Sequence, residues 1–418
     1  MGERIFPAAG PGWARELPGE EHVPRGRAVE LAHRAGSALA AARGDTCQEV
    51  SLTAAVGRVT ARDVQAACAV PHYASSAMDG YAVSGPGPWR LSPGDAAADD
   101  LPSTASDVPL APGTAVPVVT GGVIPRGTTT VVREEFAARC GDLVELAAGA
   151  PRTELAGRHI RPAGTECAAG EVLLPSGTVV SPAGAAFAAV AGADVLAVRR
   201  APRVAVLLTG SEVLTEGIPG PGRVRDAFSM SLPHVVTAQG GSVGTVRRVP
   251  DHARSLRDAF EEAATEHDLV LTTGGTARSR ADLVRPLVHR RTRLLVDQLD
   301  LQPGHPTLLG AGEQGAVLAL PGNPLGAVVA LILLGGAFTA GFLGLAPAPF
   351  RPAVLGADVA GGRAERLVPA RRHDGLWQPC RAVGSNMLRG LTAADALLAV
   401  PPAGLRAGES SVVLALPW

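Results

Sequence analysis

The chain has 418 residues, of which 46% are hydrophobic and only 3% aromatic, and its formal net charge is −1. This length and hydrophobic content predict several globular domains rather than a disordered chain. The near-neutral charge argues against nucleic acid as a partner. There is no lysine, so all 38 basic residues are arginine, and any mechanism that needs a lysine side chain is excluded.

The amino-terminal half predicts a leader, one helix and small β elements. Residues 1–21 predict a flexible leader without the apolar core of a signal peptide. Residues 29–43, "VELAHRAGSALAAAR", have the spacing and composition of a helix. Farther along, "SAMDGYA" places Asp79 on a tight turn, and "VPVVTGG" places Thr120 at the end of a short strand. This half therefore supplies one carboxylate and one hydroxyl in turn positions.

The pattern changes at Ala201. The apolar runs "RVAVLLTGSEV", "DLVLTTGG" and "GAVLALPGNP" each end in a loop of small residues, and helices are predicted between them at 227–239 and 251–267. Buried strands that alternate with helices indicate a doubly wound α/β sheet. The three loops would lie at the carboxyl ends of the strands, where such sheets bind ligands. After residue 348 the chain returns to short β segments.

One apolar stretch, residues 326–347, is long enough for a membrane span. Its internal glycines, the turn before it and the lack of a flanking positive cluster favour a buried core helix instead. The five cysteines are odd in number and include no Cys-x-x-Cys pair, which predicts reduced thiols in the cytoplasm.

Three motifs at strand ends are candidates for chemistry, each with a structural alternative. Glu212 in "LTGSEV" either holds a metal ion or caps a helix. The hydroxyls and backbone N–H groups of "TTGG" suit an anion, and the later Asp282 either returns over this loop or caps the next helix. The "LPGNP" turn at 320–324 either faces a phosphate or is only structural. His305 in "QPGHP" is either a metal ligand or structural.

Together these motifs resemble a known family. "SAMDGYA", "TGG.IP.G...VV..E", "TG.E", "TTGG......D", "QPG.P", "LPGNP" and "GS..L..L..ADAL...P" occur in the order found in molybdopterin molybdenumtransferases. These are molybdenum insertases, whose relatives include the E domain of gephyrin. The resemblance covers about residues 25–418.

The resemblance implies a multidomain α/β fold: a doubly wound molybdopterin-binding α/β domain, small β domains and a C-terminal β-barrel-like domain. The expected boundaries are a leader at 1–21, a discontinuous linker domain at 22–70 and 152–200, a small β domain at 71–151, the α/β domain at 201–347 and the C-terminal β domain at 348–418. It also implies an elongated homodimer whose clefts combine the α/β domain of one subunit with the β domain of the other.

The implied activity is Mg²⁺-dependent insertion of molybdate into adenylated molybdopterin with release of AMP, by a cytoplasmic enzyme. The implied partners are a pterin nucleotide and other cofactor-assembly proteins, with neither nucleic acid nor a membrane. The alternative is a catalytically weak paralogue that binds molybdopterin or a related pterin nucleotide as a carrier.

By position, the resemblance implies that Asp79 handles molybdate or water beside Thr120. Glu212 and Asp282 would hold Mg²⁺, with Asp251 as a further catalytic acid. The residues expected to bind the substrates are Thr120, Gly210, Asp226, Gly274, Gly275, Arg278, Arg280, Gln302, His305, Pro321, Gly322, Asn323, Pro324 and Ser385.

The chain departs from the family pattern at charged positions. Gln298, Gln302 and His305 stand where lysines are expected. Arg278 and Arg280 either replace these lost cations as anion clamps, because guanidinium binds phosphate with two hydrogen bonds, or point to solvent.

Overall fold

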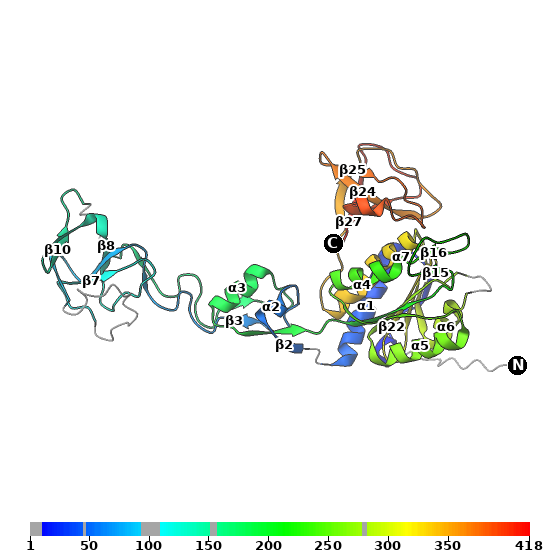
Figure 1. The fold of residues 1–418 in the computed structure, drawn as a ribbon, viewed down its shortest axis with the longest axis horizontal. Coiled ribbons are helices and arrows are strands. Elements are labelled where there is room, and N and C mark those ends of the chain that lie inside the picture. Colours follow the sequence, from blue (N-terminus) through cyan, green and yellow to red (C-terminus); the bar gives the residue numbers. More distant parts are fainter. Residues whose placement is uncertain (1–10, 45–46, 93–108, 151–156, 278–281) are drawn as a thin grey trace. The chain divides into compact units, whose positions relative to one another are not determined.

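The computed structural model describes residues 11–44, 47–92, 109–150, 157–277 and 282–418. The chain forms two compact units: residues 1–48 with 199–418, and residues 49–198 (Figure 1). The first unit holds the α/β domain and the C-terminal β sheet, and the second holds the small β sheet. None of the five cysteines forms a disulfide.

A seven-stranded, mostly parallel sheet forms the centre of the first unit. Strands β22, β18, β14 and β17 are neighbours and run parallel, whereas β21 runs antiparallel. Along β14, Val204 and Val206 belong to one hydrophobic core, and Ala205 and Leu207 belong to the core on the opposite face. Burial on both faces explains the continuous apolar runs and confirms the predicted α/β sheet. The strand order is β1 (Glu20–Val23), β19 (Arg293–Leu299), β21 (Leu308–Ala311), β22 (Ala316–Leu320), β18 (Leu269–Thr273), β14 (Arg203–Leu208), β17 (Ser242–Arg248).

Helices cover both faces of this sheet. The helices predicted at 227–239 and 251–267 are confirmed as α4 (Phe228–Ala238) and α5 (Ala253–Glu266), which pack on opposite faces. The face with α4 also carries α1 (Arg25–Arg43), α7 (Pro324–Ala330), the π-helical η3 (Leu331–Gly335) and α8 (Gly336–Phe342), and the face with α5 carries α6 (Val284–Arg291).

The continuous helix from Pro324 to Phe342 is long and apolar enough to cross a membrane by length and composition, with a mean hydropathy of 2.1. Within the fold, 89% of that stretch is buried. Leu334 and Phe338 are completely inaccessible in the main core. The burial agrees with the predicted core helix.

Helices α1 and α8 cross at very short range because each has a glycine at the contact. A Cβ atom on Gly36 would lie 2.0 Å from the Phe338 carbonyl oxygen, and one on Gly341 would lie 2.0 Å from the His33 carbonyl oxygen. Real Cβ atoms do not approach backbone oxygens so closely, so both positions require glycine. This crossing fixes α1 to the α/β domain.

A Gly36→Ala variant should therefore lower the free energy of unfolding by about 1–3 kcal/mol, the usual cost of overpacking, although alanine favours a helix by about 1 kcal/mol. Gly26→Ala on the same helix is the matched control, because nothing lies within 4 Å of its added Cβ. It should be neutral or stabilising in the same urea-unfolding measurement. Equal effects of the two changes would contradict the close crossing.

The first unit includes residues that the sequence analysis assigned elsewhere. The predicted flexible leader is wrong for residues 11–21: η1 (Gly12–Ala14) begins an ordered segment, the Trp13 indole N–H donates to the Gly312 carbonyl at 3.0 Å, and β1 pairs with β19. Burial of Ala14 and Leu17 supplies the physical reason. Helix α1, expected in the linker domain, likewise packs in the core of the α/β domain. Residues 1–10 lie outside the described residues.

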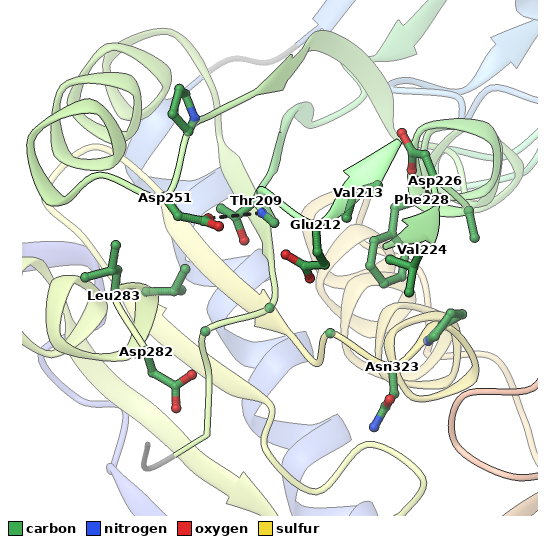
Figure 2. A pocket seen from close by; sticks show the side chains of 18 of the residues that line it. Thr209, Glu212, Val213, Val224, Asp226, Phe228, Asp251, Asp282, Leu283 and Asn323 are labelled. Carbon is green, nitrogen blue, oxygen red and sulfur yellow. Dashed lines mark hydrogen bonds between the residues drawn. The ribbon is translucent and has the colours of Figure 1, made fainter. Parts of the chain in front are cut away.

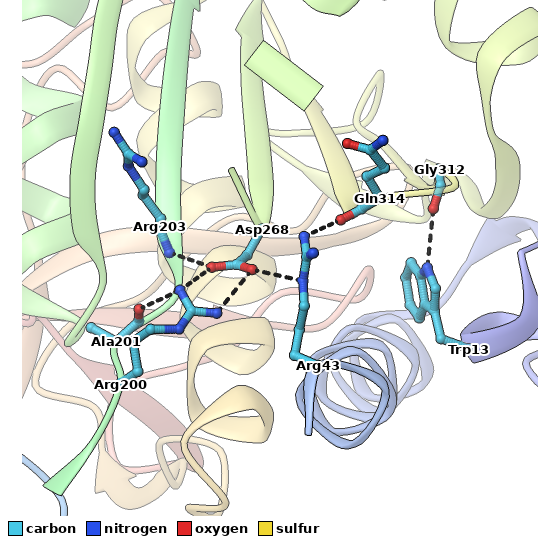
Figure 3. Close-up of polar contacts among 8 residues, drawn as sticks. All are labelled: Trp13, Arg43, Arg200, Ala201, Arg203, Asp268, Gly312 and Gln314. Carbon is cyan, nitrogen blue, oxygen red and sulfur yellow. Dashed lines mark hydrogen bonds and ion pairs between the residues drawn. The ribbon is translucent and has the colours of Figure 1, made fainter. Parts of the chain in front are cut away.

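A buried carboxylate, Asp268, joins several segments at the amino end of β18 (Figure 3). Its side chain is 3% exposed. It accepts hydrogen bonds from the Arg203 backbone N–H at 2.7 Å and from both terminal nitrogens of Arg200 at 2.8 and 3.2 Å. The Arg43 Nε at the end of α1 lies 3.3 Å away. One side chain thus ties α1, β18 and the start of β14 together.

The C-terminal sheet packs around a core of its own that includes Leu398. A single bridge between Leu355 and Trp377 links the segment after β23 to β25, and the barrel-like closure stays a prediction. The sheet order is β20 (Leu301–Gln302), β24 (Glu365–His373), β26 (Ala396–Val400), β27 (Ser410–Ala415), β23 (Arg351–Val354), with β25 (Leu376–Pro379) on β24 and η4 (Leu391–Ala393) before β26.

The second unit contains a six-stranded sheet, which confirms the predicted strands around the Asp79 turn. Its order is β8 (Thr130–Arg133), β5 (Gly80–Val83), β7 (Thr114–Val118), β6 (Trp89–Leu91), β10 (Leu143–Leu146), β9 (Ala137–Cys140), with η2 (Glu134–Phe136) between β8 and β9. Smaller elements are the strand pairs β11 (Ile160–Arg161) with β4 (Ser75–Ser76), β12 (Val172–Leu174) with β3 (Val64–Gln65) and β13 (Val195–Arg199) with β2 (Cys47–Ser51), and the helices α2 (Leu52–Ala55) and α3 (Pro182–Val190).

Candidate functional site

The loops after β14, β18 and β22 meet at one edge of the sheet and line a cavity of about 670 Å³, the first cavity (Figure 2). This is the edge that the sequence predicts for a ligand. The cavity collects Glu212, Asp226, Asp251 and Asp282 from separate segments. Of the other predicted residues, it is lined by Gly210, Gly274, Gly275, Gly322, Asn323 and Pro324.

Short contacts between the loops need glycine and threonine at the strand ends. Gly274 has φ 71°, and a Cβ there would lie 3.3 Å from the Thr209 hydroxyl. The Thr209 hydroxyl donates to the Thr273 carbonyl, and the Thr209 N–H donates to the Thr273 hydroxyl at 3.2 Å. The hydroxyls of Thr272 and Thr273 are fully buried and do not line the cavity. The expectation that these hydroxyls face an anion is therefore wrong. Of the "TTGG" motif, only the two glycines, Gly274 and Gly275, line the cavity.

Asp251 holds the turn that carries Glu212. Its two oxygens accept from the N–H groups of Gly210 at 3.1 Å and Ser211 at 2.6 Å. Burial opposes its ionisation, but these hydrogen bonds outweigh burial and keep the pKa of Asp251 below its usual value. Because both oxygens are engaged, the geometry favours a positioning role over the predicted catalytic one.

Asp226 is similarly occupied. It accepts from the N–H groups of Phe228 at 2.9 Å and Ser229 at 3.1 Å at the start of α4, and it pairs with Arg248. Burial opposes ionisation, and these contacts overcome it, so the pKa of Asp226 is lowered. Its side chain is only 3% exposed. The Asp226 carboxylate is therefore buried in the wall of the cavity and bound to protein groups.

Glu212 and Asp282 are the other two acids that line the first cavity, and Glu212 does not cap a helix. Glu212 precedes a strand, β15 (Val213–Leu214), which pairs with β16 (Val224–Arg225). Helix α6 has Leu283 at its N-cap position, without a side-chain cap hydrogen bond. Figure 2 shows both carboxylates at the first cavity, on different loops. Among the described residues no group of three His, Cys, Asp or Glu side chains could hold a metal.

The "LPGNP" turn also borders a second cavity, of about 350 Å³, and Asn323 lines both cavities. Pro321, also expected to bind the substrates, lines this second cavity and not the first. The Leu325 N–H donates to the Ser385 carbonyl at 2.9 Å and so joins the turn to the C-terminal domain. The predicted residues Gln302, His305 and Ser385 line this cavity, together with Pro303, Gly304, Pro306, Gly326, Arg366, Val383 and Gly384.

Sequence reasoning missed Arg366, which among the described residues is the one arginine that lines the second cavity. It lies on β24 opposite Gln302 of β20, and its guanidinium donates to the Ala360 carbonyl at 2.9 Å. Only this long-range strand pairing brings it to the site. Asn386, in the first cavity, was missed as well, although it follows the quoted Ser385. Gln298 is 6% exposed and lines neither cavity, while Arg278 and Arg280 lie outside the described residues.

The second unit positions Asp79 and Thr120 together, as expected. The Thr120 N–H and hydroxyl donate to the same Asp79 oxygen at 2.7 and 2.9 Å. The backbone hydrogen bond first, and the hydroxyl second, lower the pKa of Asp79. Gly80 is required in this turn, because its φ is 150° and a Cβ would lie 2.0 Å from the Val132 carbonyl oxygen. The Asp79 carboxylate is exposed, and its lowered pKa favours the ionised form.

Comparisons with known proteins agree with this architecture. Residues 27–192 match the family model described as the MoeA N-terminal region (domain I and II), and residues 205–338 match a probable molybdopterin binding domain. "Molybdopterin molybdenumtransferase 2" of Mycobacterium tuberculosis is 31% identical over 370 residues, which cover 84% of this chain and 90% of that protein. The chain belongs to the molybdopterin molybdenumtransferase family.

A further relative and two solved structures also match most of the chain. The molybdopterin molybdenumtransferase of a Nostoc species is 29% identical over 392 residues, 88% of each chain. Two crystal structures of the molybdopterin biosynthesis MoeA protein from Pyrococcus horikoshii superpose with TM-scores of 0.76 and 0.71 at 23% and 24% identity. Each covers 94% of this chain and 99% of that one, so the family fold extends over both units. This chain is thus a molybdenum cofactor biosynthesis protein by family.

Proposed function

We propose that this family member inserts molybdate into adenylated molybdopterin in a Mg²⁺-dependent reaction that releases AMP. One observation carries the proposal: Glu212 and Asp282, which come from two separate motifs, line one cavity at the carboxyl ends of three parallel strands. A polar, glycine-lined cavity suits a nucleotide with a bridging diphosphate, because glycines let the diphosphate come close to the protein backbone.

The residues present fit Mg²⁺. This ion prefers oxygen ligands and usually takes one or two carboxylates together with substrate phosphates and water. Glu212 and Asp282 supply that number, which is consistent with the lack of a three-residue metal group among the described residues. When bound, the ion supplies charge neutralisation at the diphosphate.

The chain's own groups then bind and orient the substrates. Asp251 holds the Gly210–Ser211 turn and thereby aims Glu212. We assign an anionic part of the substrates to the second cavity, where Arg366 provides a permanent charge beside His305 and Ser385. We further propose a cytoplasmic homodimer in which Asp79 acts on the substrate held by the partner chain.

An AMP-release assay tests this function. The unchanged chain, mixed with adenylated molybdopterin, molybdate and Mg²⁺, should release AMP, and Asp79→Ala should abolish the release. Tight binding of adenylated molybdopterin without AMP release would contradict the enzyme and indicate a carrier of pterin nucleotides. The carrier outcome is worth testing because this chain lacks the lysines of the family pattern.

The lowered pKa of Asp79 has a measurable consequence. A hydrogen bond to a carboxylate stabilises the charged form, so Thr120→Ala, which removes the hydroxyl donor, should raise the pKa of Asp79. The backbone donor remains, so the rise should be partial. The acid side of the profile of kcat/KM for AMP release against pH should move to higher pH. An unchanged acid side would show that Asp79 does not control the reaction. Thr128→Ala is the control, because the Thr128 hydroxyl donates to the nearby Pro125 carbonyl at 2.8 Å.

A further inference from the structure

Asp282 reaches the first cavity from a loop whose two ends are joined by Arg285. This arginine is the second residue of α6. Its backbone N–H donates to the Gly275 carbonyl at 2.9 Å, and one nitrogen of its guanidinium lies 3.5 Å from the Thr276 carbonyl oxygen. The start of the loop is thus bound to its end, three residues after Asp282.

The two ends of this loop also pack closely against each other. Gly275 has φ 62°, and a Cβ atom there would lie 3.2 Å from the Val284 side chain. Thr276 is only 2% exposed. Gly275, Asp282 and Val284 all line the first cavity. Because Asp282 is two residues from Val284, a shift at the base of the loop would move the Asp282 carboxylate as well.

Asp297 holds the Arg285 guanidinium from the sheet. Both oxygens of Asp297 accept from the same Arg285 nitrogen, at 2.6 and 2.8 Å, and the two side chains are 7% and 12% exposed. The His289 Nε2 lies farther away, at 3.7 Å. The backbone of Asp297 is fixed within β19, where it pairs with Glu21 of β1 and Leu308 of β21. The carboxylate is therefore anchored in the sheet, and Arg285 connects it to the loop.

Stability alone does not account for an ion pair in this place. A buried ion pair is often no more stabilising than an apolar pair of similar volume, because the loss of hydration offsets the attraction between the charges. Hydrogen bonds between charged groups are directional, however, and they fix the geometry of the segments that they join. The segments joined here are β19 and the loop that carries Asp282.

We propose that Asp297 and Arg285 are positioning residues that hold Asp282 in the orientation in which it binds Mg²⁺. This inference rests on the proposed function, which assigns Asp282 to the ion. Neither Asp297 nor Arg285 lines the first cavity, so both act through the loop. They would serve Asp282 as Asp251 serves Glu212, from outside the ligand set.

Calorimetric titration of Mg²⁺ into the full chain, with adenylated molybdopterin and without molybdate, tests the inference. Asp297→Asn keeps the size of the side chain and removes its charge. It should weaken Mg²⁺ binding about tenfold, the lower end of the range for residues that orient a metal ligand. Asp268→Asn is the matched control, because Asp268 is a buried, ion-paired carboxylate at the opposite edge of the same sheet. It should leave Mg²⁺ binding unchanged.

Two further variants separate positioning from stability. In an Asp282→Asn background, Asp297→Asn should weaken Mg²⁺ binding no further, because its effect passes through Asp282. The double variant Arg285→Met with Asp297→Leu replaces the ion pair by an apolar pair and should stay folded. It should nevertheless bind Mg²⁺ as weakly as Asp297→Asn, because the directional contacts to the loop are gone. Circular dichroism verifies that each variant is folded.

Several results would overturn the inference. These are unchanged Mg²⁺ affinity in Asp297→Asn, a further loss in the Asp282→Asn background, or full affinity in the apolar double variant. AMP release by the unchanged chain shows separately whether the proposed function holds. Release of AMP with any of these results would remove only the role of Asp297 and Arg285, whereas failure of the unchanged chain to bind Mg²⁺ would overturn the proposed function and this inference together.

Discussion

A Glu212→Gln variant should release AMP at least about a hundredfold more slowly than the unchanged chain, the scale of losing one preorganised electrostatic group. Glutamine keeps the size of the side chain and removes its charge, so the turn held by Asp251 should stay intact. The mutation should also weaken Mg²⁺ binding in the presence of the nucleotide, which calorimetry can measure without turnover. Normal Mg²⁺ affinity together with normal AMP release would contradict the proposed metal site.

The pair of acids offers a sharper test than either alone. If Glu212 and Asp282 hold the same ion, the double variant Glu212→Gln with Asp282→Asn should lose little more activity than the worse single variant, because groups that act as a unit are not additive. Glu216→Gln is the matched control, since Glu216 is exposed just after β15 and lines neither cavity. Fully additive losses would indicate that the two carboxylates act separately.

The second large effect concerns stability. Asp268→Asn should lower the free energy of unfolding of the first unit by about 3 kcal/mol. Breaking a buried ion pair costs about 3–5 kcal/mol, and the lower end applies because Arg43 and Arg200 are each 36% exposed and can be hydrated. Asparagine can still accept from the Arg203 N–H, so the change isolates the charge. Loss of this contact should loosen the end of α1 against the sheet.

Urea unfolding followed by circular dichroism, fitted with separate transitions for the two units, measures this loss. Asp258→Asn is the control: this aspartate is 55% exposed on α5 and pairs with Arg254 across one helical turn. Such a surface pair contributes at most about 0.5 kcal/mol. Equal stability of the two variants would show that the buried charge of Asp268 does not stabilise the fold.

The sequence alone determined three central strands of the α/β domain, β14, β18 and β22, and the helices α4 and α5. Its apolar runs are continuous because both faces of the sheet are covered, and local pattern is sufficient to recognise them. It also identified Glu212, Asp282 and the glycines of one cavity, because the carboxyl ends of neighbouring parallel strands meet at one edge. Asp79 and Thr120 were likewise predicted to be neighbours.

Only the tertiary structure decided what depends on contacts between distant segments. The pairing of β1 with β19 brought residues 11–23 into the α/β domain, and the pairing of β20 with β24 brought Arg366 to the second cavity. The hydrogen bonds of Asp226 and Asp251 showed that acids in a cleft can be occupied by backbone N–H groups. A motif specifies residue types and spacing, whereas the role of a carboxylate follows from the donors that the fold places around it.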